Sequence, residues 1–328
     1  MKRNILFFAG LLSLVLLPSC NKQNDEVGED DILIENGKIR ISSSCADDSK
    51  NVFYLKAWRF LATDVAWVNG TRLSTFPYNK GRMAHVWADT ASDNIYKALY
   101  PADAYTSTIS DIDAPTVYLY PRVSALPRIN ADTINPLNAN DHRVLPMTAY
   151  LENPSRSSRF HFYNTMCLIG PNFLYGIDFG EELMDHVGTN QYQIPNIIID
   201  SISIVAQDGQ PLWGDGVISN PYTTNPEVVL NQVTGHQQVT YVGLFEELVV
   251  NTSPTREALP NSYLPIIPCY GYFTMNIYFH CTFTDIGTCR FRYSKTSTYP
   301  QCFARSTLLN TNILMDSQSD FNNYVTVL

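Results

Sequence analysis

A strict alternation of apolar and polar side chains near the C-terminus constrains the fold more than any other sequence feature. Between Tyr272 and Phe283 every second residue is apolar, in the order Phe273, Met275, Ile277, Phe279, Cys281 and Phe283. A turn sequence at 285–288 follows, and the alternation resumes at Cys289, Phe291 and Tyr293. Because successive side chains of a strand point to opposite faces, this pattern predicts a β-hairpin with one buried face and one wetter face.

Shorter segments of the same kind occur along most of the chain, rich in β-branched and aromatic residues and separated by Pro, Asn, Asp and Gly. The predicted strands are 38–43, 52–61, 117–120, 144–150, 160–169, 227–230, 239–244 and 308–315. A second hairpin is predicted from the strand 197–205, the Asp208-Gly209 turn and the apolar run 212–214. Only 180–186 has the pattern of a short helix, so the sequence predicts an all-β protein.

Chain length predicts more than one domain. The roughly 300 residues that follow the N-terminal region exceed the usual size of a single domain. Many short strands joined by turns are typical of β-sandwiches. The polar segment 153–158 is the predicted linker between one sandwich at 37–152 and a second at 159–328, which includes the terminal strand.

The first 19 residues have the parts of a secretion signal. Cations at positions 2 and 3 precede an apolar run from Ile5 to Leu17 and then Cys20. The run is shorter than the roughly 20 residues that a membrane-spanning helix needs. Residues 16–20 resemble the lipobox of bacterial lipoproteins, which predicts a covalent lipid on Cys20 and no other cofactor. The alternative is an ordinary secretion signal with a chance cysteine.

The segment 20–36 is polar and acidic, with too little apolar surface to order itself, and is predicted to form a flexible tether. A lysine and acidic residues after Cys20 also resemble the surface-export signal of Bacteroidetes lipoproteins, and a plain acidic linker is the alternative. Acyl chains on Cys20 would hold the protein at a membrane surface. The formal net charge of −9 argues against a nucleic-acid partner, because such binding depends on cations that neutralise phosphates.

Six cysteines remain besides Cys20, without a CxxC pair or a Cys/His spacing typical of zinc sites. Export makes disulfides possible, but a chain of this size does not need them. Free, buried thiols are therefore predicted. The alternative is a bridge between Cys281 and Cys289, which lie near each other on one face of the predicted hairpin.

No catalytic motif was found, neither a GxSxG elbow, an HExxH pair, a P-loop nor a GxGxxG turn after a strand. The acidic residues Glu181, Glu182 and Asp185 could supply carboxylates for glycoside hydrolysis, but a solvated turn explains them. The run 213–216 is interpreted as a turn rather than a calcium loop. The sequence therefore predicts that the protein is not an enzyme.

Several segments, in this order, resemble the fimbrillin family of Bacteroidetes pilins. Residues 100–105 resemble a strand of the family's N-terminal domain, and 145–150 followed by 159–164 is similar to its domain junction. The segment 201–214, with its Asp-Gly turn, resembles a hairpin of its C-terminal domain. The resemblance implies two tandem transthyretin-like β-sandwich domains with Greek-key-type connections, and polymerisation by strand exchange.

In the shaft subunits of that family a protease cuts after an arginine in the loop that follows the first strand. A neighbour's C-terminal strand then fills the groove that the first strand leaves. Here the first strand corresponds to 37–45, and the loop 46–51 contains Lys50 but no arginine. Three alternatives remain open: cleavage at Lys50, another protease, or an uncut anchor or accessory subunit.

The last eight residues, 321–328, have strand character. They could complete a sheet of their own subunit or pair with an edge of another subunit. In a donor strand, Tyr324, Thr326 and Leu328 would form one face. The opposite face would carry Phe321, Asn323, Val325 and Val327.

The predicted function is that of a structural fimbrial (pilus) subunit, at the tip, as an accessory or as the anchor, that serves cell adhesion. The expected location is the outer membrane surface and the fimbrium, through a palmitate-bearing lipid anchor. Expected partners are other fimbrial subunits and a host or bacterial surface ligand. The alternative is a surface glycan-binding lipoprotein, in which aromatic residues would form a sugar platform that includes Trp58, Trp67, Trp87 and Trp213.

Overall fold

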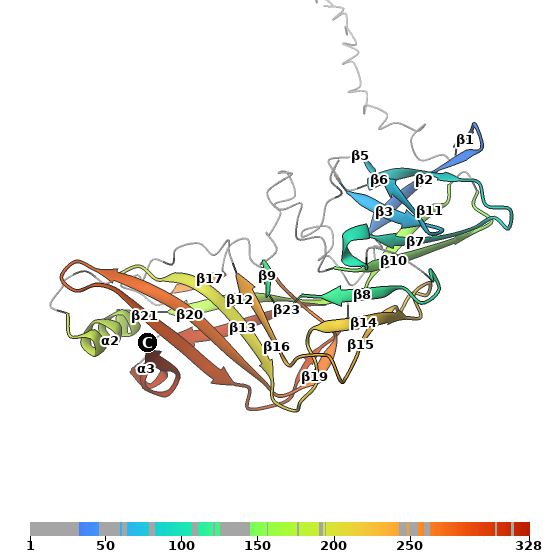
Figure 1. Cartoon of the computed structure of the whole chain (residues 1–328). Coiled ribbons are helices and arrows are strands. Elements are labelled where there is room, and N and C mark those ends of the chain that lie inside the picture. Colours follow the sequence, from blue (N-terminus) through green and yellow to red (C-terminus); the bar gives the residue numbers. More distant parts are fainter. Residues whose placement is uncertain are drawn as a thin grey trace, which may run out of the picture.

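The computed structural model describes residues 33–45, 60, 64–78, 83–106, 111–120, 122–124, 145–155, 157–175, 177–189, 193, 195–242, 248, 255–258, 263–305, 307–315 and 318–328. Strands dominate these residues, and they form several sheets (Figure 1). The prediction of an all-β protein is confirmed. In this part of the chain, no helix is long and apolar enough to cross a membrane.

The largest sheet has nine strands and comes from the first half of the chain. Its order is β4-β3-β7-β10-β11-β2-β6-β5, with β1 paired to β2 beside this path. Its neighbours pair antiparallel except β2 and β11, which are parallel. The strands are β1 (Leu33–Glu35), β2 (Lys38–Cys45), β3 (Val65–Val68), β4 (Thr71–Ser74), β5 (Phe76–Tyr78), β6 (Met83–Asp89), β7 (Ile95–Tyr100), β10 (Met147–Glu152) and β11 (Arg159–Asn164).

Two further sheets contain most of the second half of the chain. One has the order β24-β21-β20-β13-β16-β9, and the other has β17-β12-β18 with β23 paired to β12. Buried residues of both sheets belong to one hydrophobic core cluster. The strands of the first are β9 (Arg122–Ser124), β13 (Ile198–Ala206), β16 (Gln238–Val242), β20 (Phe273–Phe283), β21 (Gly287–Thr296) and β24 (Val325–Val327). Those of the second are β12 (Cys167–Tyr175), β17 (Thr255–Ala258), β18 (Leu264–Ile266) and β23 (Leu308–Met315).

Two small sheets and three helical segments complete the described structure. The three-stranded sheet has the order β15-β14-β8, and the two-stranded one pairs β19 with β22. These strands are β8 (Thr116–Leu119), β14 (Gly214–Ser219), β15 (Glu227–Leu230), β19 (Cys269–Gly271) and β22 (Gln301–Phe303). The helical segments are η2 (Ala102–Ala104), α2 (Ile177–Val187) and α3 (Gln318–Tyr324). Strand β8 pairs with β14 and strand β9 with β16, so both halves of the chain contribute to these sheets.

The hairpin predicted from the strict alternation is confirmed as β20 and β21. Ten residue pairs connect the two strands, from Thr274↔Thr296 to Phe283↔Gly287. The apolar residues Ile277, Phe279, Phe291 and Tyr293 are at most 1% exposed, as the two-residue period predicts. The short helix predicted at 180–186 is also confirmed, within α2.

The hairpin predicted across Asp208-Gly209 is wrong. Gly209 does adopt a left-handed conformation, with φ 84°, as a tight turn requires. However, both edges of β13 are already occupied, one by β16 and the other by β20. The chain after the turn therefore leaves this sheet, and β14 pairs with β15 and β8 instead.

The segment 160–169, predicted as one strand, consists of two strands in different sheets. The break lies at Thr165-Met166, where the Asn164 side-chain oxygen accepts a hydrogen bond from the Met166 N–H at 2.9 Å. The predicted linker 153–158 instead connects β10 and β11, which pair with each other inside the nine-stranded sheet. The chain thus changes sheets at 165–166, and the division into two domains stays a prediction.

Two other predicted segments have different outcomes: one is partly wrong, and the other lies almost entirely outside the described residues. Leu33–Glu35, in the predicted tether 20–36, is a strand that pairs with β2 through the turn at Asn36-Gly37. The predicted strand 52–61 lies outside the described residues except for Phe60, which is buried against Tyr100 and Phe162.

Candidate functional site

The first long strand, β2, lies inside the nine-stranded sheet rather than at its edge. On one side, seven of its residues pair antiparallel with β6, from Lys38↔Asp89 to Ser44↔Met83. On the other side β1 covers its beginning, and β11 pairs in parallel with its second half. Strands β2 and β11 are far apart in the sequence, and parallel neighbours cannot be joined by a tight hairpin turn, so their contact depends on tertiary pairing.

The side chains of β2 alternate between the core and the outer face. Ile39 and Ile41 are 3% and 0% exposed and belong to the hydrophobic core. Ser42, on the other face, lies opposite both His85 of β6 and Arg159 of β11 and is itself buried, at 3% exposure. A strand in this position contributes two main-chain ladders and two buried isoleucines, so its loss would open a strand-wide gap in the sheet.

The C-terminal segment differs from the predicted eight-residue strand. Phe321, Asn323 and Tyr324 belong to the helix α3, and only Val325–Val327 form a strand. The physical reason is packing: helical geometry turns Phe321 inward, where it is 1% exposed, against rings of α2 and its neighbours. The predicted two-residue alternation would have placed Asn323 beside it on the same face.

Two aromatic side chains hold this segment in place. The Phe321 ring lies with its centroid 5.7 Å from that of Phe179 and 4.2 Å from that of His186. Farther along, the Tyr324 ring lies 5.7 Å from that of Tyr293, and the Lys295 ammonium is 4.6 Å from its centroid. Strand β24 then pairs with β21 at three positions, and the last residues are largely exposed, Val327 at 42% and Leu328 at 63%.

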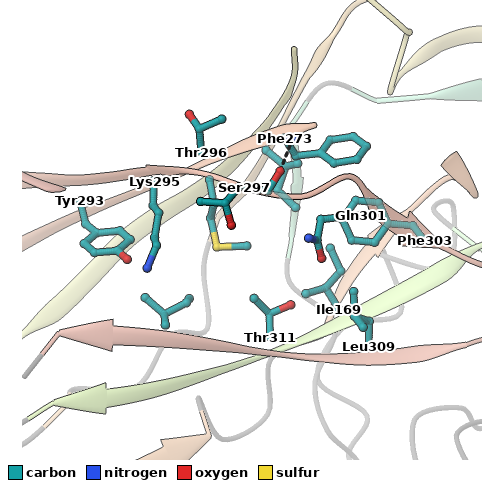
Figure 2. Close-up of a pocket in the computed structure, with 14 residues that line it drawn as sticks. Ile169, Phe273, Tyr293, Lys295, Thr296, Ser297, Gln301, Phe303, Leu309 and Thr311 are labelled. Atoms are coloured by element: carbon teal, nitrogen blue, oxygen red, sulfur yellow. Dashed lines mark hydrogen bonds between the residues drawn. The ribbon is translucent and has the colours of Figure 1, made fainter. Parts of the chain in front are cut away.

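A cavity of about 230 Å³ lies next to this segment, between the β13-β20-β21 layer and the β12-β23 layer (Figure 2). Its apolar lining comes from both layers and from β22: Ile169, Ile204, Phe273, Met275, Tyr293, Phe303, Leu309 and Ile313. Its polar lining is Lys295, Thr296, Ser297, Thr298, Gln301 and Thr311. Among the described residues, the lining combines apolar side chains with one ammonium, hydroxyls and an amide, groups that suit binding.

Five of the thiols are free, as predicted, but not all of these are buried: Cys167, Cys269, Cys281, Cys289 and Cys302. Cys281 and Cys289 are directly opposite each other on β20 and β21. Burial raises the pKa of Cys281 to about 12 and that of Cys167 to about 11. Cys302, in contrast, is exposed.

Other residues singled out in the sequence do not converge on one site. Glu181, Glu182 and Asp185 lie on α2, where the Glu182 carboxylate is 3.7 Å from the His186 ring. Within the described residues, no group of three His, Cys, Asp or Glu side chains could hold a metal ion. Cys20, Lys50 and Trp58 lie outside the described residues.

The three tryptophans in the described part of the chain are not fully exposed, as a sugar-binding platform would require. Trp67, Trp87 and Trp213 are all half-buried and belong to separate strands or loops. The Trp67 indole donates a hydrogen bond to the Ala102 carbonyl at 3.3 Å. The Trp213 ring stacks on that of His236, with centroids 4.2 Å apart.

The cavity residues were missed at the level of sequence. They come from six strands and one loop between positions 169 and 313, so their proximity depends on sheet packing. One local signal was present: Lys295 continues the buried-side alternation of Phe291 and Tyr293 in β21. A charged side chain at such a position indicates a boundary of the apolar core.

No protein-family model and no curated protein matches the sequence. Among solved structures, the chain is similar to a proposed cell adhesion protein from Bacteroides ovatus, with 11% identity and a TM-score of 0.43, over 83% of this chain and 87% of that one. It is also similar to a proposed cell adhesion protein from Bacteroides uniformis, with 12% identity and a TM-score of 0.38, over 90% and 97% of the two chains. A fimbrial assembly protein from Parabacteroides distasonis matches at 8% identity and a TM-score of 0.29, over 91% and 100%.

Proposed function

We propose that this protein is a structural subunit of a surface fimbrium, at its tip, as an accessory or as its anchor, that serves adhesion and joins its neighbours by exchange of β-strands. The observation that carries the proposal is the position of β2. The first long strand of the chain fills the space between β6 and β11, with its parallel pairing supplied by tertiary contact. Such a strand is replaceable by an equivalent strand from another subunit.

The energetics favour exchange of this strand over simple loss. Without β2, the facing edges of β6 and β11 would lose their main-chain hydrogen-bond partners. The space that the Ile39 and Ile41 side chains fill in the core would also be left empty. An inserted strand restores hydrogen bonds, each with a net contribution of about 1 kcal/mol. It also buries apolar side chains at roughly 25 cal/mol per Å². Over seven or eight residues, this makes a durable joint between subunits.

The proposed donor is the C-terminal segment 321–328. In the free subunit it is seated as α3 and β24, through Phe321, Tyr324 and three paired residues. Donation requires α3 to unwind, after which Phe321, Asn323, Val325 and Val327 lie on one face of an extended strand. The high exposure of Val327 and Leu328 supports a low cost for release of the outer end.

Maturation and anchoring complete the proposal. Cleavage after Lys50, in the loop that follows β2, would separate β2 from the rest of the subunit and permit its departure. An uncut chain would keep β2 and act as an anchor or accessory subunit. The lipid on Cys20 would hold the subunit at the outer membrane, exposed at the cell surface.

Deletion of Phe321–Leu328 tests the donor role. We expect the truncated protein to be exported and folded, with circular dichroism unchanged in its strand signal, and to form no fibres by electron microscopy. The matched control is Val233→Ser, which changes an apolar side chain that lies outside the C-terminal segment and is 92% exposed. This variant should assemble normally. Normal fibres from the truncated protein would contradict the donor role.

A second test concerns the anchor. Cys20→Ser should abolish incorporation of radiolabelled palmitate and move the protein from the membrane fraction to the soluble fraction. Cys302→Ser is the matched control, because it removes an exposed thiol far along the chain. Palmitate incorporation that persists in Cys20→Ser would rule out the lipobox interpretation.

The surface glycan-binding alternative is separated by a binding measurement. Isothermal titration of the monomer against surface polysaccharides should show no saturable heat if the protein is purely structural. Saturable binding together with an absence of oligomers would favour the alternative.

A further inference from the structure

The cavity between the two layers lies on a side of the sandwich that the C-terminal segment covers only in part. In the described part of the chain, β24 pairs with β21 from Phe291 to Tyr293, and no strand pairs with this edge beyond Tyr293. The residues that follow, Lys295 and Thr296, line the cavity together with Thr311 of β23. This part of the edge is therefore left without a strand because β24 begins only at Val325, after the helix α3.

From this geometry we propose that the cavity is a binding site for a small monocarboxylate with an apolar body, of about the size of octanoate. The inference goes beyond the structural role, since it concerns a ligand of the free subunit and requires no assembly. Three features carry it: a largely apolar lining, the cationic side chain of Lys295 in that lining, and a volume that limits the ligand's length.

The floor of the cavity is built from core residues. Ile169 and Ile204 are 0% and 1% exposed, and Phe273, Phe303 and Ile313 are at most 5% exposed. Met275, on β20, adds a flexible thioether that adapts to ligands of different shape. These side chains offer no hydrogen-bond partner, so the part of a ligand that reaches them must be hydrocarbon.

The positive charge of Lys295 favours an anionic ligand. Lys295 is the one charged side chain among the described lining residues, and Figure 2 shows it extending from β21 into the space between the layers. The Tyr324 ring, 4.6 Å from its ammonium, fixes its position from one side. Gln301 and Thr311 also point into this space in Figure 2 and offer N–H and O–H donors. An ammonium flanked by neutral donors suits a carboxylate, because each of its oxygens accepts a charge-assisted hydrogen bond.

The volume sets the length of the apolar body. A dry cavity of about 150 Å³ holds benzene, with six carbons, so this cavity of about 230 Å³ has room for about nine carbons. A palmitoyl chain of sixteen carbons is too long, which excludes the lipid predicted on Cys20 as the occupant. The ligand is thus a diffusible acid rather than the protein's own anchor.

Isothermal titration of the purified full-length monomer with sodium octanoate tests the proposal. Affinity should rise by up to about fourfold for each CH₂ added from butanoate to octanoate, and should stop rising by dodecanoate. Lys295→Gln should weaken octanoate binding by about tenfold or more, because one charge-assisted contact is lost. The matched control Lys38→Gln, at an exposed lysine of β2 that pairs with Asp89, should bind as the parent protein does.

A spectroscopic measurement locates the ligand independently of these variants. Among the methionines, Met275 is the one that lines the cavity, so its ¹³C-methyl NMR signal, assigned with Met275→Leu, should shift as octanoate is added. Equal affinity for octanol and octanoate would overturn the role of Lys295. No binding at millimolar octanoate, an unmoved Met275 signal, or affinity that keeps rising to palmitate would overturn the site itself. None of these results depends on fibre formation, so failure of this proposal and failure of the structural role are distinguishable.

Discussion

The substitution Phe321→Ala tests which contact holds the C-terminal segment against the rest of the protein. Its side chain is 1% exposed and lies against the rings of Phe179 and His186, at centroid distances of 5.7 and 4.2 Å. The outer end of the segment contributes less, since β24 pairs at three positions and Leu328 is 63% exposed. Phe321 should therefore provide most of the free energy that seats residues 318–328 on the rest of the protein.

Phe321→Ala should increase the population in which this segment is detached, while the sheets stay folded. Complete burial of such a side chain contributes about 1.5–3 kcal/mol. Its aromatic contacts add about 0.5–1.5 kcal/mol. A loss of about 2–4 kcal/mol raises the equilibrium constant for local opening by about 30-fold to 1,000-fold.

Hydrogen exchange followed by mass spectrometry measures this opening directly. Peptides from 318–328 should exchange faster in Phe321→Ala by the factor given above, and peptides from β20 and β21 should be unchanged. Asn322→Ala, at an exposed neighbour, is the matched control and should exchange as the parent does. Faster exchange spread equally over β20 and β21, or no change in 318–328, would refute the assignment of Phe321 as the local anchor.

Three further predictions follow from single contacts. Gly235→Ala should lower the free energy of unfolding by several kcal/mol in urea titrations, because an added Cβ would lie 2.4 Å from Pro211 and 2.6 Å from the Asn231 carbonyl oxygen. In the control Gly188→Ala, where φ is 70° and the added Cβ meets no atom within 4 Å, the free energy of unfolding should fall by only about 1 kcal/mol. Cys281, whose pKa burial raises to about 12, should resist alkylation by iodoacetamide at pH 8, whereas the exposed Cys302 reacts; equal labelling would contradict this. Burial, and secondly the nearby Arg40, lower the pKa of His85 below 6.5, so the unfolded state takes up a proton that the folded state resists. Stability should therefore fall as the pH drops below 6.5, less steeply in His85→Gln, and an identical pH dependence in the variant would show that His85 is not responsible.

The strands that were predicted correctly have a local signal, whereas β3 to β7 were not predicted. Side chains at Phe273, Ile277 and Phe279 alternate with polar ones whatever the rest of the chain does, and the turn at 284–286 is short enough to force the return strand. The same holds for β15 and β23, which occupy the predicted ranges exactly as 227–230 and 308–315. The helix α2 was recognisable from its local pattern as well.

The errors share one cause, which is that a strand's partners are not encoded beside it. The run 160–169 is rich in apolar residues on both sides of Asn164-Thr165, and these two polar residues were not interpreted as the change of sheet that they mark. The turn at Gly209 formed as expected, but β16 and β20 took both edges of β13. Which strand pairs with a given edge depends on the alternatives that all other strands of the fold offer.

The C-terminal segment and the cavity show the same limit for the candidate sites. Residues 321–328 carry an alternation that suits a strand, yet the contact of Phe321 with Phe179, far away in sequence, favours a helix for the first four of them. The cavity lies where β24 has not yet begun: its first residue, Val325, is opposite Tyr293, so among the described strands none pairs with β21 at Lys295.

By itself, the sequence determined that this is an all-β protein, where strands such as β15, β20, β21 and β23 run and, for the β20–β21 hairpin, which face is buried, because a two-residue period depends only on neighbours in the chain. The tertiary structure decided which strands pair, where the chain passes from one sheet to the next and where a cavity is left open. Those features depend on contacts between residues tens to hundreds of positions apart, whose free energies are comparable with the local preferences that they override.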